Sequence, residues 1–126
     1  MSYVAAARRL ILICATALPF AANDASAHAL LVKSEPARRA LLTKPPSQVR
    51  LWFNEKLEPA FCAITVTAED GKQVTEHTAR VSAQDGRLLE LALPALSPGG
   101  YTVQYQVLSV DGHTVKASYR FTVQAR

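Results

Sequence analysis

The chain has 126 residues, with 14 lysines and arginines against 10 aspartates and glutamates, so its formal net charge at pH 7 is +4. The basic residues are scattered among acidic ones, and no basic run with interleaved aromatic side chains occurs. This pattern excludes the continuous basic face of a nucleic-acid-binding domain, and we expect no nucleic acid partner.

Residues 1–27 have the organisation of a secretory signal peptide. Arg8 and Arg9 form a positively charged start, residues 10–22 are apolar, and Ala25-Ser26-Ala27 has the small-x-small pattern that signal peptidase recognises. The apolar segment is shorter than the roughly 20 residues that a membrane-spanning helix needs. We therefore expect cleavage after Ala27 and a mature protein that is soluble; a retained signal anchor is the alternative.

The predicted mature chain, residues 28–126, is long enough for one small domain with a single core. Cys14 leaves with the signal peptide, so Cys62 is the one cysteine that remains and no internal disulfide can form. Cys62 lies in an apolar run, which predicts a small buried side chain; a copper ligand or a redox thiol is the alternative.

The remaining sequence predicts an all-β domain, because short strand-like runs alternate with turn signals and no helical period occurs. Asp70-Gly71 is a hairpin signal, and residues 94–100, with two prolines and two glycines, predict a turn. This arrangement is typical of a β-sandwich or a β-barrel. The predicted strands are residues 48–53, 61–68, 72–74, 79–82, 88–93, 101–110 and 115–123.

His28 becomes the first residue of the chain if the signal peptide is cut after Ala27. A leading histidine offers a metal two nitrogens, the free α-amine and the imidazole Nδ1, which close a chelate ring. These donors suit Cu(II) well.

Asp111 and His113 lie between the last two long strands and form a second candidate cluster. They are two residues apart, so in extended geometry both side chains leave the same face and could complete a site begun by His28. The alternative is an ordinary Asp-Gly turn with a solvated histidine. A catalytic dyad is a third reading, but no nucleophile motif accompanies it. We expect His77 to be an exposed polar side chain.

The chain resembles the CopC family of periplasmic copper-resistance proteins. Members are small Greek-key sandwiches of immunoglobulin-like shape, so the resemblance implies about seven strands and a copper site in the periplasm. The matching segments, in order, are residues 28–37, 49–55, 96–103, 109–113 and 121–123.

The resemblance also implies a set of metal ligands. The family's Cu(II) site uses the first histidine, an aspartate and a histidine two residues later, which match His28, Asp111 and His113. Glu55 occupies the place of a glutamate that some members bring near the metal, as an axial ligand or an outer acceptor; a solvated loop carboxylate is the alternative. Many relatives hold Cu(I) in a methionine-rich loop, but this chain has only Met1, so it is similar to the subgroup with a Cu(II) site alone.

These observations together predict a periplasmic Cu(II)-binding protein of copper homeostasis and resistance, without catalytic activity. By family analogy it sequesters copper or passes it to an inner-membrane partner of the CopD type. Two alternatives stay open: a histidine-brace copper monooxygenase, and a metal-free structural or adhesion module.

Overall fold

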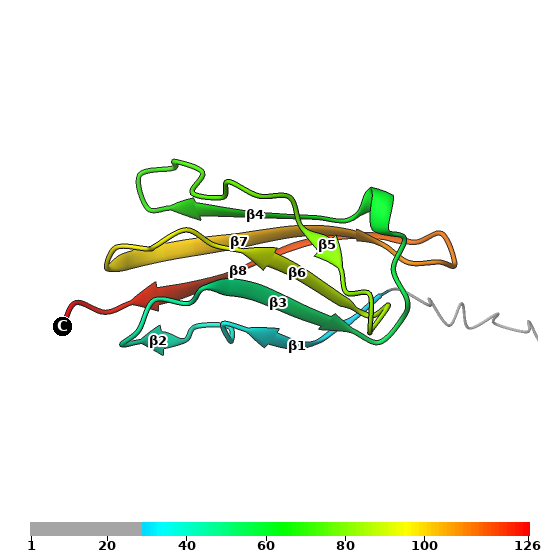
Figure 1. Cartoon of the computed structure of the whole chain (residues 1–126), viewed down its shortest axis with the longest axis horizontal. Coiled ribbons are helices and arrows are strands. Elements are labelled where there is room, and N and C mark those ends of the chain that lie inside the picture. Colours follow the sequence, from blue (N-terminus) through cyan, green and yellow to red (C-terminus); the bar gives the residue numbers. More distant parts are fainter. Residues whose placement is uncertain (1–28) are drawn as a thin grey trace, which may run out of the picture.

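The computed structural model describes residues 29–126 as two packed four-stranded sheets (Figure 1). One sheet has the strand order β1-β3-β6-β5, and the other has the order β2-β8-β7-β4. A single 3-10 turn, η1 (Pro59–Phe61), precedes β4. The strands are β1 (Leu31–Glu35), β2 (Leu41–Leu42), β3 (Gln48–Phe53), β4 (Ala63–Ala68), β5 (Arg80–Val81), β6 (Leu88–Ala92), β7 (Gly99–Leu108) and β8 (Thr114–Val123).

The prediction of an all-β sandwich is confirmed, with eight strands where about seven were expected. Two of the eight, β2 and β5, contain only two residues each. Every pair of neighbouring strands is antiparallel except β2 and β8. The Greek-key connectivity stays a prediction. The predicted signal peptide and His28 lie outside the described residues.

The core lies between the two sheets, where the predicted alternation of β3 and β7 holds. Val49, Leu51 and Phe53 are buried from β3, while Arg50 and Trp52 between them stay partly exposed. Their apolar partners come from the inward positions of β7, and the rings of Phe53 and Tyr105 meet edge to face with centroids 5.6 Å apart. The inward residues of β7 are Tyr101, Val103, Tyr105 and Val107.

Strand β1 was not predicted, and its irregular pairing explains why. Its partner register on β3 shifts between Leu31 and Lys33, so two residues of β1 oppose one of β3 at this point. Such a bulge breaks the two-residue alternation by which a strand is recognised in a sequence. Val32, in the bulge, is 63% exposed.

The segment predicted as one strand over residues 61–68 is divided. Pro59–Phe61 forms the 3-10 turn, and the strand begins only at Ala63. Cys62, at the junction, is buried, and its thiol donates to the carbonyl oxygen of Glu58 over 3.2 Å. The prediction of a small buried cysteine is therefore confirmed.

The hairpin predicted at Asp70-Gly71 forms, but its return is too irregular to be a strand. Ala68 N–H donates to Lys72 O over 2.9 Å, and Val74 N–H donates to Val66 O over 2.9 Å. Residues 72–74 therefore pair with the end of β4 through isolated bonds and not through a continuous ladder.

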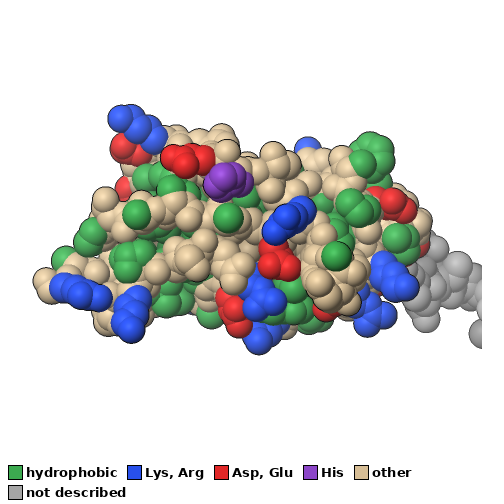
Figure 2. Space-filling model, viewed as in Figure 1, with side chains coloured by type: hydrophobic (Ala, Val, Ile, Leu, Met, Phe, Trp, Pro, Cys, Tyr) green, Lys and Arg blue, Asp and Glu red, His purple; other side chains and the backbone are tan. Residues whose placement is uncertain are grey.

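Charged side chains of both signs are interspersed over the face shown in Figure 2, with no continuous area of one sign.

On β3, Trp52 is flanked by two cations: Lys33 Nζ lies 4.6 Å and Arg50 Cζ lies 4.7 Å from its ring centroid. Among residues 29–126, no helix is long and apolar enough to cross a bilayer.

Candidate metal centre

The loop between β7 and β8, residues 109–113, is a tight turn closed by backbone hydrogen bonds. Gly112 N–H donates to Ser109 O over 2.9 Å, and Ser109 N–H donates to His113 O over 3.1 Å. Gly112 has φ +93°, a conformation that disfavours other residues. The loop therefore presents Asp111 and His113 on a fixed backbone.

Asp111 and His113 meet, although not for the reason that the sequence suggested. The extended geometry expected for these residues was wrong, because the segment is a turn. The turn nevertheless brings His113 Nδ1 to 3.2 Å from Asp111 Oδ1. The two side chains are 46% and 31% exposed, respectively, so a metal ion can reach them from solvent.

Ser109 orients the carboxylate of Asp111. This serine is fully buried, and its hydroxyl donates a hydrogen bond to Asp111 Oδ1. The same hydroxyl lies 3.3 Å from His113 O.

Glu55 is brought to the same place by the segment that follows β3. Val110 N–H donates to Lys56 O over 3.0 Å, and Leu57 forms an isolated antiparallel bridge with Ser109. These bonds attach the Glu55 segment to the β7–β8 loop, and the Glu55 carboxyl shares a hydrogen bond with Asp111. These contacts place the Glu55 segment beside Asp111 and His113; that the three residues bind a metal stays a prediction.

The pKa values of the two carboxyl groups are shifted in opposite directions. Loss of hydration, followed by the charge and hydrogen bond of Asp111, raises the pKa of Glu55. The hydrogen bond from Ser109 is the main cause that lowers the pKa of Asp111, and His113 lowers it further. Asp111 is therefore the more readily available anionic donor, and Glu55 more readily keeps a proton.

The described chain begins beside these residues. Ala29 is buried in the core, and Leu30 is fixed to Asn54 by two hydrogen bonds: Leu30 N–H to Asn54 Oδ1 over 2.7 Å, and Asn54 N–H to Leu30 O over 3.0 Å. Asn54 directly precedes Glu55. His28, the residue before Ala29, lies outside the described residues.

Within residues 29–126, no group of three or more His, Cys, Asp and Glu side chains is arranged closely enough to hold a metal ion by itself. The other described histidine, His77, is exposed as predicted and lies in a separate groove with Arg80 and Glu90.

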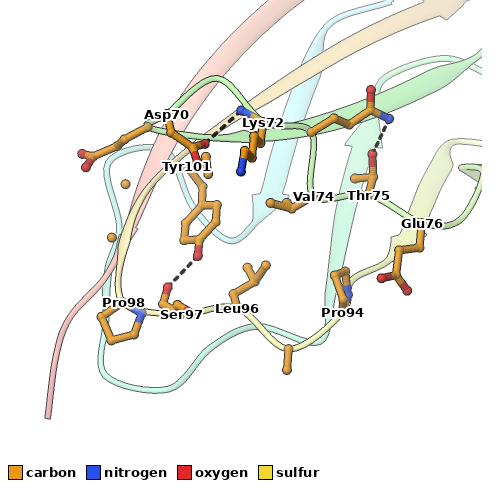
Figure 3. A pocket seen from close by; sticks show the side chains of 16 residues that line it. Asp70, Lys72, Val74, Thr75, Glu76, Pro94, Leu96, Ser97, Pro98 and Tyr101 are labelled. Carbon is orange, nitrogen blue, oxygen red and sulfur yellow. Dashed lines mark hydrogen bonds between the residues drawn. The ribbon is translucent and has the colours of Figure 1, made fainter.

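A groove of about 590 Å³ lies at the other end of the sandwich, and Figure 3 shows the side chains that line it. It is lined by the segment after β4 and the loop before β7, whereas the β7–β8 loop follows the far end of the ten-residue β7. Polar groups that line it bond to one another: Tyr101 Oη donates to Ser97 O over 2.6 Å, and Lys72 N–H donates to Asp70 Oδ1 over 2.9 Å. None of the predicted ligands lines this groove.

Two residues at the centre had no predicted role, Ser109 and Asn54. A signal for Ser109 was present in the sequence, because the inward alternation of β7 through Val107 continues to position 109. A polar residue at a buried position needs a hydrogen-bond partner, and Asp111 lies two residues away. Nothing comparable in the sequence indicates the Asn54–Leu30 pairing.

Comparison with known families decides which group of proteins this arrangement represents. The sequence model of the CopC domain family matches residues 31–124, which is nearly all of the described chain. The chain belongs to the CopC family. The resemblance found in the sequence is thereby confirmed, and the match covers both β3 and the β7–β8 loop.

Individual relatives agree with this membership. The chain is 36% identical over 99 residues to protein YobA of Escherichia coli K12, covering 78% of this chain and 80% of that one. It is 32% identical over 114 residues to copper resistance protein C of Xanthomonas campestris pv. juglandis, covering 86% and 89%. It also matches copper transport protein CutJ of Bacillus subtilis at 29% identity, covering 84% of this chain but only 20% of that longer protein.

Among solved structures, CopC from Methylosinus trichosporium OB3b superposes with a TM-score of 0.73 at 37% identity, covering 77% of this chain and 94% of that one. PcoC of Escherichia coli, described as a methionine-rich copper resistance protein, superposes with a TM-score of 0.65 at 26% identity, covering 78% and 100%. Both comparisons support the sandwich architecture of Figure 1.

Proposed function

We propose that this chain binds one Cu(II) ion through the α-amine and imidazole of His28 together with Asp111 and His113. Glu55 then lies beside the metal as an axial ligand or an outer hydrogen-bonding group. The protein holds or transfers copper and does not catalyse a reaction.

One observation carries this proposal: Asp111 and His113 meet at 3.2 Å in a loop that is hydrogen-bonded to the segment after β3, and the same segment holds Leu30 through Asn54. Burial of Ala29 and the two Asn54–Leu30 hydrogen bonds fix the chain direction there. We propose that His28, the residue directly before Ala29, adds its nitrogens to this pair. Domain membership alone would not supply this juxtaposition.

The donor set favours Cu(II) over other common ions. An amine, two imidazoles and a carboxylate form a nitrogen-rich set that suits tetragonal Cu(II), which is also the strongest binder in the divalent series. Zn(II) uses the same atoms but prefers a tetrahedral arrangement. Cu(I) prefers thiolates and thioethers, and residues 28–126 contain no methionine and only the buried Cys62.

The names of relatives support a role with copper. Copper resistance protein C and copper transport protein CutJ are both matched over more than four-fifths of this chain. The absence of methionine from residues 28–126 contrasts with the methionine-rich relative PcoC, so copper exchange between a Cu(II) site and a thioether Cu(I) site is not part of this proposal.

The proposal includes export and a receiving partner. Cleavage after Ala27 in the periplasm would free the His28 amine, so that export completes the metal site. The copper-loaded protein then sequesters the ion or delivers it to an inner-membrane protein of the CopD type. A monooxygenase is less well supported, because Trp52 is flanked by Lys33 and Arg50 and forms no flat aromatic platform.

Mass spectrometry of the protein recovered from the periplasm tests this proposal. The denatured mass identifies the first residue, and the native mass after addition of Cu(II) gives the stoichiometry. We expect a chain that starts at His28 and holds one copper ion. A chain that starts elsewhere, or that takes up no copper, would contradict the proposal.

A further inference from the structure

Among residues 29–126, Ser109 is the one buried residue that is neither apolar nor aromatic, and its place is unusual for a serine. It continues the inward row of β7, whose other members are apolar or aromatic. A buried hydroxyl without a partner destabilises a fold, so a serine here needs a bonding role that alanine or valine would not need.

The hydroxyl has a single proton and two nearby oxygens. Asp111 Oδ1 is the closer acceptor, and His113 O is farther away, at 3.3 Å. A hydrogen bond to an ionised carboxylate is stronger than one to a neutral carbonyl. The proton therefore belongs to Asp111.

The backbone of Ser109 is held independently of its hydroxyl. Its N–H donates to His113 O over 3.1 Å, its carbonyl oxygen accepts from Gly112 N–H over 2.9 Å, and it bridges to Leu57. Loss of the hydroxyl leaves all of these bonds in place. The turn should therefore keep its shape while Asp111 loses the contact that fixes the rotation of its carboxylate.

We propose that Ser109 is a positioning residue of the copper site, which holds the Asp111 carboxylate in the orientation that coordinates the metal. This proposal rests on the proposed function, because it assigns Asp111 to the metal. Hydrogen-bonding partners of metal ligands set ligand orientation, and their loss costs roughly 10–100-fold in metal affinity.

A double-mutant cycle tests whether Ser109 acts through Asp111. Ser109→Ala, Asp111→Ala and the double variant are exported, recovered from the periplasm and titrated with Cu(II) against a competing chelator. We expect Ser109→Ala alone to weaken binding by about tenfold and to change the Cu(II) electron paramagnetic resonance spectrum. In the Asp111→Ala background, removal of the Ser109 hydroxyl should change neither quantity further, because the ligand on which it acts is gone.

Two further variants separate positioning from general destabilisation. Ser118→Ala removes an exposed hydroxyl from β8 and should leave affinity and spectrum unchanged. Ser109→Thr keeps the hydroxyl and should retain the wild-type spectrum. The unfolding midpoint of each metal-free variant shows that it is folded, and Ser109→Thr provides the decisive spectrum if Ser109→Ala does not fold.

Each outcome has one meaning. Equal losses from Ser109→Ala in both backgrounds, or a folded Ser109→Thr protein with the spectrum of Asp111→Ala, would overturn the positioning role. Unchanged binding in Ser109→Ala alongside strong loss in Asp111→Ala would overturn it while leaving the proposed function intact. Unchanged binding in Asp111→Ala would overturn both proposals.

Discussion

At the residue scale, the candidate centre depends on a few side chains that identifiable contacts hold in place. Ser109 bonds Asp111, Asp111 meets His113, and Asn54 fixes the chain at Leu30. None of these contacts belongs to the apolar core. Changes at the ligands should therefore affect metal binding and stability separately.

His113→Ala should abolish tight Cu(II) binding while the metal-free fold persists. The imidazole is 46% exposed, so its loss opens no cavity, and the free energy of unfolding should change by no more than about 1 kcal/mol. His77→Ala is the matched control, because it removes another exposed histidine of the described residues, one that lies in a separate groove with Arg80 and Glu90. Competition titration and urea unfolding of both variants provide the test, and loss of binding in His77→Ala would place the site elsewhere.

Glu55→Ala should weaken Cu(II) binding less than His113→Ala does. Loss of hydration and the Asp111 carboxylate raise the pKa of Glu55, whereas the hydrogen bond from Ser109 lowers that of Asp111, so protons compete with a metal more strongly at Glu55 than at Asp111. Glu76→Ala, at an exposed acid in the segment between β4 and β5, is the control for loss of one negative charge. Should Glu55→Ala bind as weakly as His113→Ala, Glu55 would be a principal ligand.

At the scale of elements, the sequence predicted the regular strands well and the irregular ones poorly. Strand β3 has the predicted bounds, and β7 and β8 differ from their predicted ranges by one or two residues, because apolar side chains at alternate positions face the core. Strand β1 was missed because of its bulge, and β2 because two residues form no pattern.

The same contrast applies to the candidate centre. The residue types and spacing of Asp111 and His113 identified them, although a closed turn and not extended geometry makes them meet. Only family resemblance indicated that Glu55 lies there, because its position depends on the Val110–Lys56 and Leu57–Ser109 pairing between distant segments. Contacts between distant segments have no local signal.

Strand β8 carries a tyrosine whose burial predicts a loss of stability in alkali. Burial raises the pKa of Tyr119 to about 12 from 10.0, so between these pH values the folded protein keeps a proton that the unfolded chain releases. Stability should therefore be intact below pH 10 and decline as the pH approaches 12. Burial raises the pKa of Tyr101 and Tyr105 in the same direction.

The comparison of wild type with Tyr119→Phe tests this prediction. Urea midpoints at pH 9 and pH 11 should fall with pH in both proteins, but less in the variant, since it lacks the group with the largest shift. An equal decline in both proteins would show that Tyr119 keeps an ordinary pKa in the fold.

At the scale of the whole molecule, the groove of Figure 3 and the candidate metal centre lie at opposite ends of the sandwich. Strand β7 has ten residues, from Gly99 to Leu108, and at about 3.4 Å a residue it spans roughly 30 Å. The groove of Figure 3 is beside its start, and the candidate metal centre follows its end. Changes in the groove should therefore leave copper binding unaffected.

The whole chain should discriminate strongly between the two oxidation states of copper. Residues 28–126 offer no thioether, and the thiol of Cys62 is buried with its pKa raised by burial, so no exposed soft ligand is present for Cu(I). Competition with a Cu(I) chelator under anaerobic conditions should strip the ion completely, whereas Cu(II) is retained. Tight retention of Cu(I), and its loss in Cys62→Ala, would show that the cysteine is a ligand.

The central claim is that the free amine of His28 completes the copper site, and a Cu(II) titration of the protein with and without one glycine inserted before His28 tests it most directly. Both proteins are recovered after export, and their first residue is verified by mass. A peptide nitrogen has no lone pair available at neutral pH, so the extended protein loses one ligand and one chelate ring together. We predict that it binds Cu(II) far more weakly than the native protein and more weakly than Glu55→Ala. We also predict that native affinity rises with pH, because copper competes with protons for an amine whose ordinary pKa is about 7.7–8.0. Equal affinity of the extended and native proteins would contradict the account.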